Sequence, residues 1–395
     1  STPSQQEIGL PRQNLPRLYS NLHSAFNLLT LIKCSSSSQT PSLLSSPHSS
    51  LPMFNEQTWK SQERPLIKLE DDIWQLRLPL PYALDHVNVY LIQGDEGWTL
   101  VDTGLNISKA RELWEQTFAE LGIGPTDVAQ IVVTHVHPDH FGLAGWLQER
   151  FSRPEKQVPV FISAADHQKF LGIWEGQLEG KSFDGLTRFL IRCGIPADQV
   201  QAITKGTVST ATKTMPHPTF TPIPSTGTID MGNRTWEVIH APGHADGQII
   251  FYDPTDRLFL SGDQVLMKIT PNIGYWDHTK PGVLQRYLDS LAQLQNYDVR
   301  VGYPGHKWLI ADWQRRISEM FTHHKKRLAA TLDEVRQEAG ISADGVSQAV
   351  FRLGELNVHQ STFAIAETLA HLDSLEASNA IQREEVDGVW RFSVV

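Results

Sequence analysis

Short apolar or alternating stretches begin near residue 66 and are separated by turn residues, a pattern that predicts β-strands. Apolar side chains at helical spacing, including Ala110, Trp114 and Phe118, predict an amphipathic helix over residues 108–121. A second helix is expected over residues 143–151. The strands are expected at residues 73–78, 87–92, 98–102, 131–134, 227–230, 235–240, 249–252 and 258–261.

Helices dominate two further regions. Residues 164–205 carry many large apolar side chains, and 164–225 is expected to form an inserted region that covers the site as a lid. Sheet, helices and then sheet again predict a layered α/β sandwich. Beyond Trp313, three helices are expected over 317–338, 344–353 and 362–375, with a hairpin after them whose turn is Asp387-Gly388. Three helices and a hairpin resemble a winged helix.

This pattern divides the chain into an extension at 1–65, a central domain at 66–312 and a helical domain at 313–395. In the extension, residues 8–55 contain no Asp or Glu and hold runs of serine, so we predict disorder. Because it lacks acidic residues, this segment also resembles an organellar transit peptide. The alternative is that the natural protein starts at Met53 and the preceding residues have no function. The expected location is the cytoplasm, or an organellar matrix if the segment is a transit peptide.

Composition narrows the class of protein. The 395 residues are 40% hydrophobic and 20% charged, as in an ordinary globular protein. No apolar run reaches the roughly 18 residues that a membrane-spanning helix needs, so no membrane contact is expected. The net charge of −10 opposes non-specific binding to nucleic acid. Cys34 and Cys193 lie in unlike surroundings and predict no disulfide.

The sharpest feature is a histidine cluster, Thr-His-Val-His-Pro-Asp-His, at residues 134–140. It directly follows a predicted buried strand, so it occupies a loop at a strand's carboxyl end, where α/β folds build their sites. Four ligand-type side chains in one turn are costly unless a cation neutralises and organises them. The cluster therefore predicts a metal site, against the alternative of a polar surface turn.

Three more candidate ligands follow later strands, each directly after a glycine. They are His244, Asp263 and His306. Glycine lets the backbone approach closely and adopt turns that a side chain would prevent. Each residue alone would more often be an ordinary turn residue, but together with the cluster the three extend the predicted metal site.

In this order, these residues resemble the metallo-β-lactamase superfamily over about residues 66–313. The resemblance implies an α/β fold, a four-layer αββα sandwich, followed here by the small winged-helix-like domain. It implies that Asp102 supports the ligands without chelating. It also implies a first metal held by His135, His137 and His244, a second held by Asp139, His140 and His306, and Asp263 bridging both. Two zinc ions suit this set, with iron or manganese as alternatives.

The same resemblance suggests the chemistry. True β-lactamases of the superfamily lack the bridging aspartate, so Asp263 disfavours an antibiotic-destroying role and favours the glyoxalase II, lactonase and endoribonuclease-like branches. Two ions can lower the pKa of a shared water toward about 7, and the hydroxide can attack a small ester, thioester or lactone. Asp139 is the candidate catalytic residue for proton transfer, and Asp102 for support of the ligands.

Substrate contacts are predicted around the site. Trp174, Tyr275 and Trp276, with Phe170 and Phe183, could cover the metals and favour an acyl or aromatic substrate; the alternative is that they pack as core. Lys268 could pair with a substrate carboxylate or simply be solvated. The expected partner is a small acyl or ester molecule. The sequence leaves open whether the chain forms a homodimer.

Two rival functions use the same site. Cleavage of single-stranded RNA is suggested by a basic stretch of the helical domain, which holds Arg315, Arg316, Lys325, Lys326 and Arg327. Oxygen chemistry at a single iron, as in the persulfide dioxygenases that share this fold, would use only the first set of ligands. Asp263 and His306 therefore argue against the iron function.

Overall fold

The computed structural model describes residues 64–175, 184–351 and 358–395. The predictions of disorder or a transit peptide before residue 64, and of a contact by Phe183, lie outside these residues. None of the described helices combines the length and apolarity required to cross a membrane.

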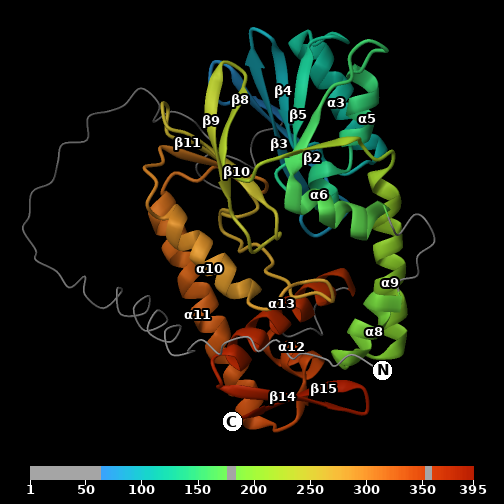
Figure 1. The fold of residues 1–395 in the computed structure, drawn as a ribbon, viewed down its shortest axis with the longest axis vertical. Coiled ribbons are helices and arrows are strands. Elements are labelled where there is room, and N and C mark those ends of the chain that lie inside the picture. Colours follow the sequence, from blue (N-terminus) through green and yellow to red (C-terminus); the bar gives the residue numbers. More distant parts are fainter. Residues whose placement is uncertain (1–63, 176–183, 352–357) are drawn as a thin grey trace, which may run out of the picture. The chain divides into compact units, whose positions relative to one another are not determined.

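Two β-sheets form the centre of the fold (Figure 1). The first has seven strands in the order β1-β2-β3-β4-β5-β6-β7, antiparallel from β1 to β4 and parallel from β4 to β7. Its strands are β1 Leu66–Lys68, β2 Ile73–Pro79, β3 His86–Gly94, β4 Gly97–Val101, β5 Val128–Val132, β6 Val160–Ser163 and β7 Phe220–Ile223.

The second sheet has five strands in the order β12-β11-β10-β9-β8. Only β11 and β12 pair in parallel. The strands are β8 Gly227–Met231, β9 Arg234–His240, β10 Ile249–Asp253, β11 Leu258–Gly262 and β12 Val301–Pro304. The two sheets share a buried core in which Tyr90 and Ile92 of β3 pack with Trp236 and Phe251 of the second sheet.

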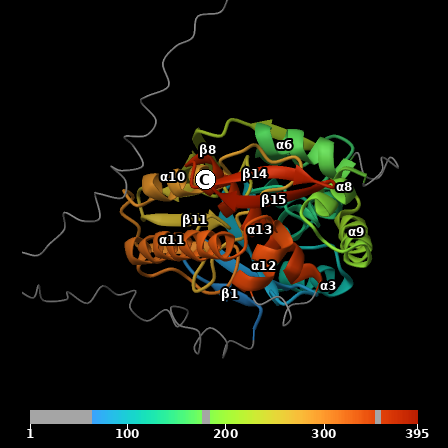
Figure 2. The same ribbon diagram turned by 90° about the horizontal axis from the view of Figure 1, so that it is seen from below.

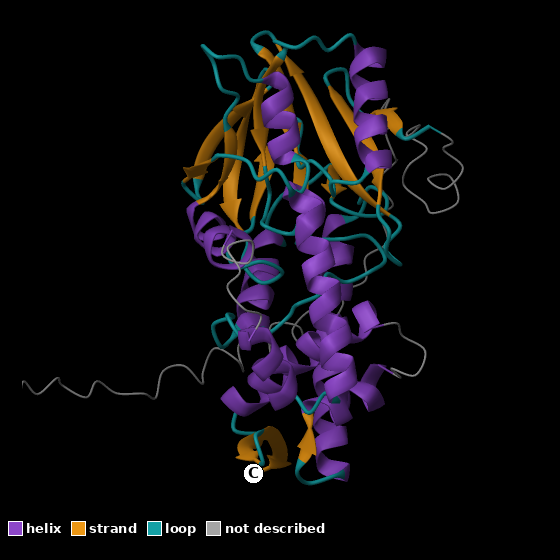
Figure 3. Ribbon diagram, turned by 90° about the vertical axis from the view of Figure 1, so that its right-hand side faces the viewer, coloured by secondary structure: helices purple, strands orange, loops and turns teal. Residues whose placement is uncertain are grey.

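Helices cover the outer face of each sheet and complete four layers (Figure 3). On the first sheet, α3 Ser108–Leu121 and α5 Ala144–Phe151 bury Trp114, Phe118 and Phe151. On the second, α10 Val283–Leu294 and the start of α11 Trp313–Gln337 bury Tyr287 and Trp313. The predicted αββα sandwich is confirmed.

Helices also fill the segment between β6 and β7. They are α6 Ala164–Phe170, the π-helical turn η2 Leu171–Glu175, α8 Asp184–Arg192, α9 Ala197–Ala211 and the short η3 Thr212–Thr214. Phe189 and Leu190 of α8 pack with Ile365 and Leu369 of the C-terminal helices. The inserted region is therefore packed on the C-terminal part, and its role as a lid stays a prediction.

The C-terminal part contains the predicted helices and hairpin. After α11 come β13 Ile341–Ser342, α12 Ala343–Phe351, α13 Val358–Ala377, β14 Ile381–Val386 and β15 Val389–Val394. The last strands form a sheet in the order β13-β15-β14, which packs on α13 (Figure 2). This helical region is present as expected, whereas the winged-helix name stays a prediction.

Candidate metal centre

The candidate ligands and the supporting Asp102 come from loops at the carboxyl ends of five strands. Asp102 follows β4, and residues 133–140 follow β5, where the short helix α4 Pro138–Phe141 begins. His244, Asp263 and His306 follow β9, β11 and β12. The strands of both sheets thus deliver side chains far apart in sequence to one place.

All seven candidate ligands meet there. Their ligand atoms form three groups within 4.8 Å: His135 with His137 and His244, His135 with His140 and Asp263, and Asp139 with His140 and His306. Asp263 connects the groups, because its Oδ2 lies 3.5 Å from His244 Nε2 and 3.2 Å from His306 Nε2. Its Oδ1 lies 3.4 Å from His140 Nε2.

Several atoms in this place lack a hydrogen-bond partner. Among the described residues, His135 Nε2, His140 Nε2 and Asp263 Oδ1 are buried without one. A buried polar atom left without a partner costs about 1–3 kcal/mol. Imidazole nitrogens and a carboxylate oxygen are also the donors that zinc and related ions take. The donor set and its orphaned atoms therefore fit bound metal ions.

Hydrogen bonds on the far side of the rings turn Nε2 toward the centre. His140 donates from Nδ1 to Asp102 Oδ2 at 2.8 Å, and His306 donates from Nδ1 to the carbonyl of His86 at 2.8 Å. His244 donates from Nδ1 to the carbonyl of Asn272 at 2.9 Å. Such partners fix the tautomer and orientation of metal-binding imidazoles.

Asp102 is held for this task by Thr134, in the loop that follows β5. Its backbone is left-handed, with φ 58°, and its carboxylate accepts hydrogen bonds from the backbone N–H and the hydroxyl of Thr134 at 2.8 and 2.9 Å. Thr134 directly precedes the histidine cluster. The position of Asp102 agrees with the supporting role that the resemblance implies.

The first group of ligands is electrically neutral in the metal-free protein. Burial lowers the pKa of His135 well below its usual value, and the neighbouring histidines lower it further. Burial and His244 lower the pKa of His137 in the same way, and burial lowers that of His244. Neutral imidazoles are the form that binds a metal.

The second group carries charges of both signs. Burial opposes the protonation of His306, but Asp263 and Asp139 outweigh it and raise its pKa to about 9. Asp263 and Asp102 likewise raise the pKa of His140 well above its usual value despite burial. Burial disfavours the ionised carboxylates, yet these two histidines hold the pKa of Asp139 and of Asp263 below the ordinary value. In the metal-free protein, the protons on His140 and His306 thus neutralise the charges of Asp139 and Asp263, as a bound cation would.

Close approach explains two of the glycines. A Cβ on Gly305, just before His306, would collide with Asp263 Oδ1 and would lie 2.8 Å from His140 Cε1. A Cβ on Gly243, just before His244, would lie 2.5 Å from Cβ of Tyr287, and its φ of 143° suits glycine. Side chains at these positions would push the ligands apart.

The predicted substrate residues differ in their degree of burial. Trp174 is buried and donates from Nε1 to the carbonyl of Val136, between two ligands, at 3.1 Å. Tyr275 and Trp276 are partly buried and pack with the C-terminal helices. Lys268 is exposed, in a left-handed conformation with φ 71°. A contact with substrate stays a prediction for all four.

One buried carboxylate was not predicted from the sequence. Asp166, at the start of α6, accepts hydrogen bonds from the backbone N–H groups of Val136 and Gly247 at 2.9 and 2.8 Å. It thereby ties the histidine cluster to the loop of His244. The only local signal is Ser163, whose hydroxyl accepts a hydrogen bond from the N–H of Asp166 as a helix cap.

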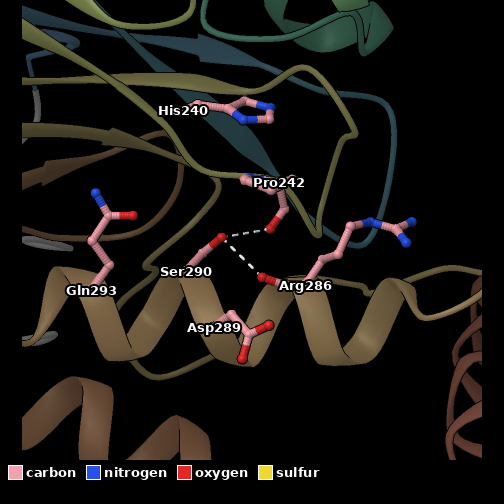
Figure 4. A pocket seen from close by; sticks show the side chains of 6 residues that line it. All are labelled: His240, Pro242, Arg286, Asp289, Ser290 and Gln293. Atoms are coloured by element: carbon pink, nitrogen blue, oxygen red, sulfur yellow. Dashed lines mark hydrogen bonds between the residues drawn. The ribbon is translucent and has the colours of Figure 1, made fainter. Parts of the chain in front are cut away.

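A pocket elsewhere on the surface offers no rival site. It is lined by His240, Pro242, Arg286, Asp289, Ser290 and Gln293 (Figure 4). The Ser290 hydroxyl bonds to the carbonyls of Pro242 and Arg286, and His240 bonds to the carbonyl of Asp246. These polar groups are satisfied within the protein, and the pocket includes none of the seven candidate ligands.

Comparison with known families and proteins agrees with this geometry. Residues 82–306 match the family model "Metallo-beta-lactamase superfamily", and residues 328–395 match "Metallo-beta-lactamase-like, C-terminal domain". A probable metallo-hydrolase of Bacillus subtilis is 28% identical over 79% of this chain and 94% of its own length. An atrochrysone carboxyl ACP thioesterase of Aspergillus novofumigatus is 25% identical over 70% of this chain and 66% of its own.

Two crystal structures resemble the whole described fold. A metallo-beta-lactamase family protein of Thermus thermophilus is 32% identical, with a TM-score of 0.72 over 83% of this chain and 100% of the other. A beta-lactamase domain protein of Burkholderia ambifaria is 30% identical, with a TM-score of 0.73 over 84% of this chain and 94% of the other.

Proposed function

This chain belongs to the metallo-beta-lactamase superfamily, and we propose that it uses two metal ions to hydrolyse a small thioester, ester or lactone. Its relatives include a probable metallo-hydrolase and thioesterases. The observation that carries the proposal is the place of Asp263. Its Oδ2 lies within 3.5 Å of His244 on one side and of His306 on the other, so one carboxylate can serve two ions.

The seven candidate ligands would form two sets, one for each ion. His135, His137 and His244 would hold the first, and Asp139, His140 and His306 the second, with Asp263 shared. When bound, such ions lower the pKa of a coordinated water to about 7 and polarise a substrate carbonyl. Zinc suits this mixture of imidazoles and carboxylates, and iron or manganese would also be accepted.

Asp139 is the proposed proton carrier. Its side chain is 22% exposed, against 7% for Asp263, and its Oδ2 lies 3.4 Å from His306 Nε2. A carboxylate that is open to solvent on one side can accept a proton from the attacking water and pass it to the leaving group. In thioester hydrolysis, water adds to the carbonyl carbon, the C–S bond breaks, and an acid and a thiol leave.

Thioesters are the favoured class of substrate. Four relatives of this chain are named as thioesterases, with identities of 20–29%. A histidine and carboxylate centre needs no serine or cysteine nucleophile for such a bond. The buried Cys193 packs away from the centre, in the core of α8, α9 and the C-terminal helices.

RNA cleavage is less well supported by the basic residues of α11. Arg316 is buried and donates to the carbonyls of Leu266 and Ile269. Arg315 pairs with Glu319, and Arg327 lies over the Phe351 ring. These three guanidinium groups already have partners within the protein, which lowers their availability for phosphates.

A substrate panel tests the proposal. The metal-free protein is loaded with zinc, iron(II) or manganese and offered an acyl thioester, a lactone, a phosphodiester and single-stranded RNA. We expect thioester turnover that a chelator abolishes and added metal restores, and we expect Asp139→Asn to lose most of it. Asp298→Asn, at an exposed ion pair with Arg257, is the control. Turnover that survives chelation, or oxygen uptake with one iron per chain, would contradict the proposal.

A further inference from the structure

One ligand of the centre is oriented by a loop that the C-terminal helices hold. His244 donates from Nδ1 to the carbonyl of Asn272 at 2.9 Å. Asn272 lies in the loop between β11 and α10. The acceptor is a backbone atom, so its position depends on what fixes this loop.

The side chain of Asn272 is anchored on α13. Its Nδ2 donates to the carbonyl of Phe363 at 2.9 Å and to Glu367 Oε2 at 3.4 Å. Both partners belong to the first half of α13, more than 90 residues further along the chain. The two hydrogens of the Asn272 amide are therefore both directed at the C-terminal helix.

The side chain of Glu367 is buried where it makes this contact, and burial removes the water that would otherwise solvate its carboxylate. It is 7% exposed, and among the described residues its Oε1 has no hydrogen-bond partner. Arg327 Nε and His323 Nε2, both on α11, lie 3.7 and 3.8 Å from the carboxylate. A buried ion pair often stabilises a fold no better than well-packed apolar side chains would, so helix packing alone does not explain this carboxylate.

The same loop has further attachments to these helices. Arg316 of α11 donates to the carbonyls of Leu266 and Ile269 at 2.6 and 2.7 Å. The N–H of Tyr275 donates to the carbonyl of Ala366 on α13 at 2.9 Å. The loop is thus held on both sides of Asn272, and α11 and α13 together set its position.

We infer that the C-terminal helices are part of the metal centre. Asn272 and Glu367 act as positioning residues that hold the carbonyl on which His244 is oriented, and they thereby raise the affinity of the first group of ligands for its metal. The inference rests on the proposed function, because it requires that His244 binds a metal. It assigns to the C-terminal domain a task in metal binding rather than in RNA binding.

The test measures metal affinity rather than turnover. Zinc dissociation constants are measured by competition with a chromophoric chelator for the parent, N272A, N272D, E367Q and the pair N272D/E367Q. N272A removes both anchors of the loop and should weaken zinc binding by up to about 10- to 100-fold, which is the cost when a metal-binding histidine loses its outer partner altogether. N272D places a second carboxylate against Glu367 and should weaken it at least as much.

The paired variant supplies the rescue. In N272D/E367Q the glutamine amide can donate to the new aspartate, so the contact is restored with its polarity reversed, and zinc should bind more tightly than to N272D alone. E376Q is the matched control, because Glu376 also lies on α13 but pairs with Arg383, and its affinity should equal that of the parent. Thermal unfolding of each metal-free variant reports its stability separately.

The outcomes separate the two proposals. A parent protein that binds neither zinc, iron(II) nor manganese refutes the proposed function, and a parent that takes one of the other two ions instead of zinc is compared with its variants by that ion. A parent that binds zinc, with N272A and N272D within twofold of it, refutes only the inference, as does a loss of thermal stability without a loss of affinity. If N272D does not fold, the same twofold limit is applied to N272A alone.

Discussion

The carboxylate of Asp166 accepts a hydrogen bond of 2.8 Å from the backbone N–H of Gly247, and this contact joins two loops of the metal centre. The other oxygen of Asp166 accepts from the N–H of Val136, between His135 and His137. A Cβ on Gly247 would lie 2.5 Å from the Asp166 carboxylate. The glycine is therefore what allows the loops to come together.

Replacing Asp166 by alanine should destabilise the fold. Two buried N–H groups would lose their acceptor, at about 1–3 kcal/mol each, so we expect a loss of about 2–5 kcal/mol in the free energy of unfolding. Urea denaturation of the metal-free protein measures it. Glu149→Ala, an exposed site on α5, should change the stability by no more than about 0.5 kcal/mol. A loss of similar size in both variants would contradict the account.

The stability that Asp166 contributes should also depend on pH. Burial raises the pKa of Asp166 to about 6, although the two backbone hydrogen bonds oppose the shift. A raised folded pKa gives stability that is present below the unfolded value of about 4 and is lost as the pH rises through 6. The difference between the metal-free parent and Asp166→Ala should therefore be larger at pH 4.5 than at pH 7.5. A constant difference across this range would show that the carboxylate titrates normally.

Adding a methyl group at Gly305 should disrupt the shared metal position. The Cβ of Gly305→Ala would collide with Asp263 Oδ1, so we expect fewer bound ions per chain in metal analysis. Gly206→Ala is the control, since a Cβ there meets nothing within 4 Å in the middle of α9. That change should keep the metal content and add up to about 1 kcal/mol of helix stability. Full metal content in Gly305→Ala would mean that the ligands need no such closeness.

Metal binding should tighten as the pH rises. His306 has a pKa of about 9 in the metal-free protein because Asp263 and Asp139 outweigh the effect of burial, so near neutral pH a metal must displace its proton. Each displaced proton makes the affinity fall about tenfold per pH unit below that pKa. Zinc competition between pH 6.5 and 9 measures the slope. An affinity independent of pH would show that His306 is already neutral or does not bind the ion.

Much of this fold could be predicted from local pattern. The helix Ser108–Leu121 was predicted to the residue, because Ala110, Trp114 and Phe118 repeat at helical spacing. The candidate ligands could be proposed because four of them share one short stretch after a strand, and the other three each directly follow a glycine. The helical spacing and the clustering of candidate ligands both involve neighbouring residues, so they can be recognised without knowledge of the fold.

Other parts depend on contacts that a sequence does not display. The strands β1, β6, β7 and β13 were missed because each has only two to four residues, too few to show a period. The helix α10 was also missed, although its apolar stripe, Leu284, Tyr287 and Leu291, has helical spacing. The role of Asn272 could not be predicted, since the atom that meets His244 is a backbone carbonyl.

The central claim is that seven side chains bind two ions which share Asp263. The measurement that tests it most directly is anomalous diffraction from crystals of the zinc-loaded protein. We predict two zinc peaks per chain, one among His135, His137 and His244 and the other among Asp139, His140 and His306, with Asp263 touching both. A single peak, or zinc bound away from Asp263, would contradict the claim.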